Sequence, residues 1–321
     1  MSRPVFHSAF AGEINAYLNY KISSGHKAGS FCVHLQHFDD FCIQQGIKEP
    51  VFTKEDAVKW VQKKDTEATT THYSRVNAIK QFLMFLSRKD YDVYVTRDVR
   101  FKPTEFQPHI YTEDEVRRYF HAVDTYESAR NRKAAVQYPV LFRLLYCCGT
   151  RINETLGIRK QDVDLENGIV KLSETKNDCE RYIVLGDDLQ ALVQQFAEKC
   201  FYLLNDQDYV FTTSNGGRLS GDVIYEVHRS FLHQARIPYH GGGKGPRIHD
   251  WRHTMAVYSF KQMMDAGMDM YVALPILSAY LGHKTIYATE RYVRLTMSIY
   301  PYIEKKFRSK IEKVFEGGPG L

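Results

Sequence analysis

Residues 245–295 read GPRIHDWRHTMAVYSFKQMMDAGMDMYVALPILSAYLGHKTIYATERYVRL. This stretch contains the histidine, arginine and tyrosine residues from which we build a candidate reactive site. His249 and Arg252 are three residues apart, so on a helix they lie on one face. His283 ends a Leu-Gly-His sequence, and Tyr292 follows nine residues later. A phenol has a pKa of about 10 and needs nearby positive charge or a base to attack phosphorus. The stretch therefore predicts a site that binds a phosphate and attacks it with a tyrosine.

A second cluster lies upstream, where residues 148–156 read CGTRINETL. Arg151 and Glu154 have the same three-residue spacing, just past the expected end of a helix. Two arginines can bind the non-bridging oxygens of one phosphate and neutralise the charge that grows in the transition state. On its own, such an Arg–Glu pair is more often a surface ion pair.

Lys176 lies in a polar turn between two stretches with strand character, residues 168–173 and 181–185. A lone lysine in a turn usually serves solubility alone. If its pKa were lowered inside a phosphate site, the same lysine could donate a proton to a leaving 5′-oxygen.

The composition is that of a folded protein, with 44% hydrophobic and 25% charged residues. Forty-three basic and 38 acidic residues give a net charge of +5, which is compatible with a nucleic-acid partner. The six cysteines include no C-x-x-C pair, which argues against a zinc ribbon or a disulfide framework. No signal peptide opens the chain and no apolar run reaches 18 residues, so we expect a protein of the reducing cytoplasm.

Apolar residues recur at helical spacing from about residue 13 to residue 86 and predict an all-helical bundle. Arg75 and Lys80 fall off its apolar stripe and are expected to be solvated. The pattern lapses before Pro103 and Pro108. We therefore predict a helical DNA-binding domain at residues 1–102, a linker at 103–110 and a catalytic domain at 111–321 that ends in a C-terminal helix.

Capping signatures at Thr53 and Thr112 predict helix starts. The expected fold class is α+β, mainly α with a small β-sheet.

Taken together, these motifs resemble those of the tyrosine recombinase (phage integrase) family. The matching positions are Arg151, Glu154, Lys176, His249, Arg252, His283 and Tyr292. The catalytic match runs from about Thr112 to Leu295, and the helical region before it is similar to the family's core-binding (SAM-like) domain. Two features depart from the family pattern, namely Trp251 in place of a leucine and the glycine-rich stretch around Lys244.

The resemblance implies DNA integration or transposition chemistry in which Tyr292 attacks a phosphodiester, forms a 3′-phosphotyrosyl bond and frees a 5′-hydroxyl. It implies that Arg151, Arg252 and His283 hold the phosphate. Lys176 would protonate the leaving oxygen, His249 would assist proton transfer, and Glu154 would orient Arg151. Because the ester keeps the bond energy, no metal ion, ATP or other cofactor is expected.

The expected partners are double-stranded DNA with inverted-repeat core sites, a homotetramer formed through the basic C-terminal helix at 302–315, and accessory DNA-bending or directionality factors. The protein would act at the nucleoid and not on a membrane. Further DNA contacts are expected from Arg75, Lys80, Lys244 and Arg247.

Several alternatives stay open. An integrase or transposase of a mobile element is favoured over a resolvase or chromosome-dimer recombinase of the same chemistry. A type IB topoisomerase or a non-catalytic DNA-binding regulator is less favoured. The spacing of His249 and His253 also resembles a helical zinc pair, but Asp250 stands where the zinc proteases carry a glutamate and no familiar third ligand follows.

Overall fold

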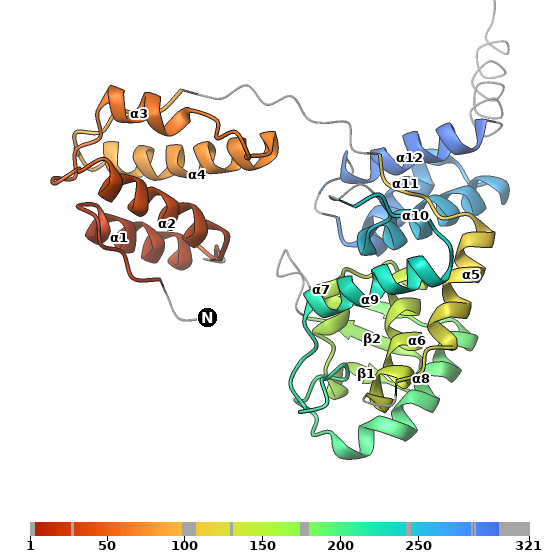
Figure 1. Ribbon diagram of the computed structural model, residues 1–321. Helices are drawn as coiled ribbons and strands as arrows, with labels where there is room; N and C mark the ends of the chain where they lie inside the picture. The colour runs from red at the N-terminus through yellow and green to blue at the C-terminus, as the bar shows by residue number, and fades with distance from the viewer. Residues whose placement is uncertain are drawn as a thin grey trace, which may run out of the picture. The chain divides into compact units, whose positions relative to one another are not determined.

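The computed structural model describes residues 4–26, 29–97, 107–128, 131–173, 180–241, 245–283, 285 and 287–301. The chain divides into two compact units, Met1–Phe106 and Gln107–Leu321 (Figure 1). The predicted linker at 103–110 spans this division, but residues 103–106 lie outside the described part, so its conformation stays a prediction. Within the described ranges, no helix combines the length and the apolar character needed to cross a bilayer.

The first unit is built of helices around an aromatic core, which confirms the predicted helical fold of this region. Its helices are α1 (Ala11–Ser23), α2 (Gly29–Gln44), α3 (Lys54–Val61) and α4 (Thr69–Ser87). The ring of Phe38 lies 5.3–5.7 Å from the rings of Phe10, Phe52, Trp60 and Phe82. Such clusters bury large apolar areas, so many of the chain's aromatic residues serve the core.

The second unit is a mixed α/β domain, as the expected fold class requires. Its helices are α5 (Glu113–Asp124), α6 (Arg132–Cys147), α7 (Ile152–Leu156), α8 (Asp187–Cys200), α9 (Gly221–Gln234), α10 (Ile248–Asp265), α11 (Met270–Leu281) and α12 (Tyr287–Ile299), with 3-10 turns η1 (Lys160–Asp162) and η2 (Phe201–Leu203). Its strands are β1 (Val163–Asp164), β2 (Ile169–Leu172) and β3 (Arg181–Val184), joined in the antiparallel order β1-β2-β3. The predicted hairpin of β2 and β3 is confirmed, with Ile169 opposite Val184. Strand β1 was missed because two residues are too few to show an alternating pattern.

Capping boxes start helices α3 and α5, as their sequences predicted. The Thr53 hydroxyl accepts a hydrogen bond from the Asp56 backbone N–H at 3.2 Å, and the Asp56 carboxylate accepts one from the Thr53 N–H at 3.1 Å. At the start of α5, Thr112 and Glu115 exchange the same pair of bonds at 3.2 and 2.8 Å. Each exchange satisfies two backbone donors that a helix start leaves open.

Helices α6 and α10 form the centre of the second unit. Helix α6 packs against α5, α8 and α10, and α10 packs in turn against α11 and α12. Figure 1 shows α10, α11 and α12 side by side at the blue end of the chain. This packing brings segments that are distant in sequence to the first turns of α10.

Candidate active site

The five predicted catalytic residues that the structure describes come from four segments of the second unit. Arg151 directly precedes α7, His249 and Arg252 lie at the start of α10, His283 follows α11, and Tyr292 lies within α12. The Arg252 guanidinium lies 3.2 Å from His283 Nε2. The rings of His283 and Tyr292 are nearly parallel, at 6°, with centroids 5.9 Å apart. The ends of three helices therefore meet around one site.

Two predicted residues fall outside the described part of the chain. Lys176 lies in the stretch 174–179, and Lys244 lies in the stretch 242–244. Their proposed roles, proton donation and DNA contact, stay predictions.

Among the cations of the site that the structure describes, Arg252 is the most buried, with 1% of its surface exposed. One terminal nitrogen donates to the Gly149 carbonyl at 2.6 Å, and the other donates to the Leu281 carbonyl at 2.5 Å. Gly149 lies two residues before Arg151, and Leu281 lies two residues before His283. The guanidinium therefore connects α10 to the segments that carry Arg151 and His283. Burial, followed by the nearby charge of Arg151, lowers the pKa of Arg252 to about 10. The side chain is therefore still a cation at neutral pH.

The contacts of His283 determine which ring nitrogen carries its proton. Nδ1 lies 2.8 Å from Thr289 Oγ1, and Nε2 faces the Arg252 guanidinium. A guanidinium can only donate, so Nε2 accepts and the proton of the neutral ring lies on Nδ1, which donates to Thr289. Burial, followed by the charge of Arg252 and two further arginines, lowers the pKa of His283 to about 4.

Tyr292 is buried, with 3% of its surface exposed. Its ring centroid lies 5.3 Å from that of His253 and 5.9 Å from that of His283. Burial raises the pKa of the Tyr292 phenol, whereas the charge of Arg252 and a hydrogen bond from it act in the opposite direction. The phenol is therefore protonated at neutral pH, and it lies next to a cation that can stabilise its phenolate.

Glu154 was predicted to orient Arg151, and in the structure it contacts both the side chain and the backbone of Arg151. Its carboxylate accepts a hydrogen bond from the Arg151 guanidinium at 2.5 Å and one from the Arg151 backbone N–H at 3.0 Å. Burial alone would raise the pKa of this carboxyl, but the charges of Arg181 and Arg151 outweigh burial and the pKa is lowered. Glu154 is therefore an anion, and it fixes the direction of a side chain that is 23% exposed.

The ring of His249 lies edge-on to that of His253, with centroids 4.9 Å apart at 86°. Although His249 is an exposed residue, partial desolvation of its ring, followed by the charges of Arg252 and two further arginines, lowers its pKa to about 4. The imidazole is therefore neutral at pH 7 and can accept a proton. Within the described ranges, no three potential metal ligands lie together, so the zinc interpretation of this histidine pair gains no third ligand there.

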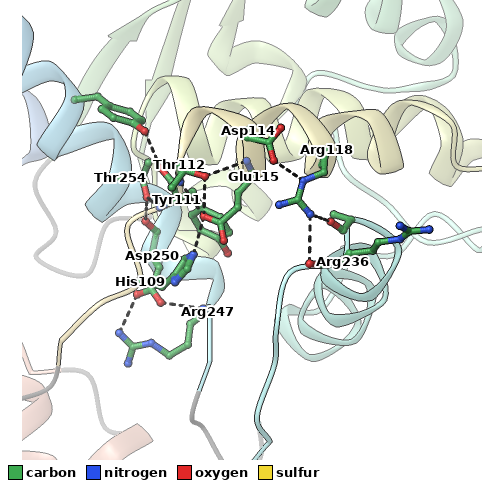
Figure 2. A network of polar contacts seen from close by, with 12 residues as sticks. His109, Tyr111, Thr112, Asp114, Glu115, Arg118, Arg236, Arg247, Asp250 and Thr254 are labelled. Atoms are coloured by element: carbon green, nitrogen blue, oxygen red, sulfur yellow. Dashed lines mark hydrogen bonds and ion pairs between the residues drawn. The ribbon is translucent and has the colours of Figure 1, made fainter. Parts of the chain in front are cut away.

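Figure 2 shows the polar contacts that hold the first turn of α10. The Arg247 guanidinium and backbone N–H both donate to the buried Asp250 carboxylate, at 3.1 and 2.9 Å. The Tyr111 backbone N–H donates to Thr254 Oγ1 at 3.1 Å. The Tyr111 ring stacks on Trp251 at 3.8 Å and 2°. Arg247 was predicted to contact DNA, and with 37% of its side chain exposed that role stays a prediction.

Arg75 in the first unit corrects the prediction of a solvated, DNA-contacting side chain. It is buried, with 4% of its side chain exposed. Its guanidinium donates to the Glu67 carboxylate at 2.7 and 2.9 Å and to the Trp60 and Gln62 carbonyls at 2.6 and 3.0 Å. Arg75 therefore ties α4 to the segment that follows α3. The predicted exposure was wrong because periodicity ranks arginine as a surface residue and does not reveal a carboxylate across a loop. Lys80 is half-buried, and its contact with DNA stays a prediction.

We expect the second unit to lose stability as the pH falls from about 6.5 towards 4. Burial is the first cause that lowers the pKa of His253 to about 3 and that of His283 to about 4, from an ordinary value of 6.5. In this range the unfolded chain binds more protons, so the stability present above pH 6.5 is lost on acidification. The buried His253 alone would contribute a slope of about 1.4 kcal/mol per pH unit. Urea denaturation at several pH values measures the slope, which His253→Asn should reduce; an unchanged slope would contradict this account.

Comparison with known proteins finds similarity both over the second unit and over nearly the whole chain. Residues 110–298 match the Phage integrase family. A Sinorhizobium fredii protein that carries the name integrase/recombinase y4rB is 26% identical over 320 residues, which cover 96% of this chain and 99% of that protein. Tyrosine recombinase XerC of Staphylococcus saprophyticus is 25% identical over 279 residues, which cover 85% and 88% of the two chains.

Solved structures share the fold. The XerH site-specific recombinase bound to palindromic difH substrate has a TM-score of 0.64 at 15% identity, covering 87% of this chain and 79% of XerH. The Tn1549 transposon integrase in complex with transposon right end DNA also has a TM-score of 0.64, at 14% identity, covering 87% and 94%. The family match spans more than half of the sequence and includes every residue of the site just described. The chain therefore belongs to the phage integrase family of tyrosine recombinases, enzymes that cleave and rejoin DNA.

Proposed function

We propose that this protein is a site-specific recombinase, the integrase or transposase of a mobile element, with Tyr292 as its nucleophile. The observation that carries the proposal is the position of the Tyr292 phenol, next to the Arg252 cation and parallel to the His283 ring. A protonated phenol held beside a buried cation is prepared to become a phenolate as it attacks phosphorus.

In the cleavage step, Tyr292 Oη forms a bond to the scissile phosphorus and the bond from phosphorus to the 5′-oxygen breaks. The phenol proton passes to the neutral imidazole of His249, whose pKa rises when the negative phosphate enters. Lys176 supplies the proton that the leaving 5′-oxygen needs. The products are a 3′-phosphotyrosyl ester and a free 5′-hydroxyl. A 5′-hydroxyl of another strand reverses these steps, so this scheme uses neither ATP nor a metal ion.

Positive charge stabilises the pentavalent transition state. Arg151 and Arg252 would donate to the non-bridging oxygens, and Glu154 would keep Arg151 pointed at them. His283 would join them once the negative phosphate raises its pKa and Nε2 gains a proton that it can donate. Removing a single donor of this kind from an enzyme typically slows the reaction by about 100- to 1,000-fold. The presence of three such groups explains how a weakly acidic phenol can act as the nucleophile.

The proposed substrate is duplex DNA with inverted-repeat core sites, bound at the nucleoid by a homotetramer. The palindromic substrate of XerH and the transposon end bound by the Tn1549 integrase support this choice. The name integrase/recombinase that y4rB carries, together with the transposon integrase among the similar structures, favours a mobile element, and chromosome-dimer resolution is the second candidate. Helix α11 exposes apolar side chains, Tyr271 by 74%, Val272 by 52% and Ile276 by 44%, which supports contact with a further protein surface. The proposed C-terminal helix at 302–315 lies outside the described residues.

The test uses duplexes taken from the DNA that flanks the gene, each nicked so that the freed end diffuses away. A denaturing gel run in the presence of EDTA should show a covalent protein–DNA adduct. Tight, salt-sensitive binding to the same duplex without an adduct would favour a DNA-binding regulator instead. Relaxation of supercoiled DNA without strand exchange would favour the topoisomerase alternative.

A further inference from the structure

Arg181, the first residue of β3, connects three segments that surround the site. Its Nη2 donates to Glu154 Oε2 at 2.7 Å, and its Nη1 donates to the Tyr280 carbonyl in the last turn of α11 at 3.0 Å. The side chain is 11% exposed. A single guanidinium therefore links the strand of the hairpin, the start of α7 and the end of α11.

The Glu154 carboxylate is divided between two arginines. Oε1 accepts from the Arg151 guanidinium, and Oε2 accepts from both Arg181 and the Arg151 backbone N–H. Arg151 binds both oxygens from its own segment, and Arg181 adds a donor to Oε2 from β3, so the carboxylate is also fixed relative to the hairpin. Among the influences that lower the pKa of Glu154, the charge of Arg181 is the largest. Arg181 therefore contributes to the direction of Arg151 through the carboxylate that both guanidinium groups contact.

The aliphatic part of Arg181 also lies against the residue that precedes His283. Gly282 has a left-handed φ of +65°, and a Cβ at this position would lie 3.0 Å from Arg181 Cδ and 3.3 Å from its Nε. Position 282 therefore requires a glycine for two reasons. Its backbone has a left-handed conformation, and the Arg181 side chain approaches it closely.

We propose that Arg181 is a positioning residue for strand cleavage. It orients Arg151 through Glu154 and fixes the backbone before His283, so that two phosphate-binding groups on separate segments keep the spacing that one phosphate requires. Lysine cannot substitute fully, because only a planar guanidinium donates in two fixed directions to a carboxylate and a carbonyl. This inference rests on the proposed function, but its first test does not require DNA.

The first test follows Glu154 and Arg151 by NMR in the full chain without DNA. In Arg181→Gln, the pKa of Glu154 should rise, because burial then acts with one cation fewer to oppose it, and the Arg151 guanidinium signals should show greater motion. Arg181→Lys should restore part of both effects. Lys171→Met is the matched control, since Lys171 lies on the neighbouring strand and pairs with Glu180 at the surface at 2.9 Å. Glu154 and Arg151 signals that stay unchanged in Arg181→Gln would overturn the proposal.

The second test measures the single-turnover rate of adduct formation at saturating DNA. Arg181→Gln should slow cleavage about 100-fold without weakening DNA binding, as expected when a phosphate-binding group is displaced by about 1 Å. Arg181→Lys should recover part of the rate, and it becomes the deciding variant if melting curves show that Arg181→Gln does not fold. A wild-type rate in a folded Arg181→Gln would also overturn the proposal. Failure of the wild-type protein to form any adduct would count against the proposed function, while the NMR result still decides the role of Arg181.

Discussion

Tyr292→Phe is expected to abolish the covalent protein–DNA adduct and to leave DNA binding intact. The substitution removes only the phenolic oxygen, and the remaining ring still fills the space between His253 and His283. Without its nucleophile the enzyme should cleave at least about 1,000-fold more slowly, because no other group can form the ester. The loss of one hydrogen bond from Arg252 should reduce stability by only about 1 kcal/mol.

The measurement compares adduct formation on a nicked duplex with binding to the same duplex by electrophoretic mobility shift. Tyr202→Phe is the matched control, because it removes the same atom from a tyrosine that is 75% exposed after the end of α8. The control should form the adduct at the wild-type rate. An adduct that persists in Tyr292→Phe would show that the nucleophile is a different residue.

Arg252→Lys is expected to reduce both cleavage and stability, although it keeps the positive charge. A lysine ammonium cannot reproduce the fork that serves the carbonyls of Gly149 and Leu281 at 2.6 and 2.5 Å. At least one buried carbonyl would lose its donor, which should lower the free energy of unfolding by about 1–3 kcal/mol. The loss of a fixed donor at the phosphate should slow cleavage by about 100- to 1,000-fold.

Urea denaturation and single-turnover cleavage at saturating DNA separate these two effects. Arg218→Lys is a suitable control, because Arg218 also donates to two backbone carbonyls, those of Leu156 and Asn153, each at 2.9 Å. This control should lose stability and keep its cleavage rate. If a folded Arg252→Lys cleaves at the wild-type rate, Arg252 serves the fold alone.

Much of the fold and the neighbourhood of Tyr292 follow from local sequence. Capping boxes give the helix starts at Thr53 and Thr112, because the partners of each bond are three residues apart. The Leu-Gly-His sequence ends α11 because glycine adopts the left-handed conformation, and this places His283 directly after the helix. Structural features that are determined by residues within one or two helical turns of each other could therefore be predicted from the sequence.

Contacts between distant segments could not be predicted in this way. Arg181 and Glu154 are 27 residues apart. The sequence predicts that Glu154 orients Arg151, but local spacing gives no sign that Glu154 also binds Arg181. The burial of Arg75 depends on Glu67, which lies across a loop, and only tertiary structure brings the two together. The Tyr111–Trp251 stack joins residues separated by most of the second unit, and no local pattern pairs them.

That stack has a mechanical consequence. Tyr111 lies only a few residues after the end of the first unit, and its ring and backbone are fastened to Trp251 and Thr254 on α10. Tyr258 adds a third attachment, because its hydroxyl donates to the Tyr111 carbonyl at 2.8 Å. A displacement of Tyr111 would therefore be passed to the helix that carries His249 and Arg252, because two of the three attachments, at Trp251 and Thr254, lie within one helical turn of Arg252.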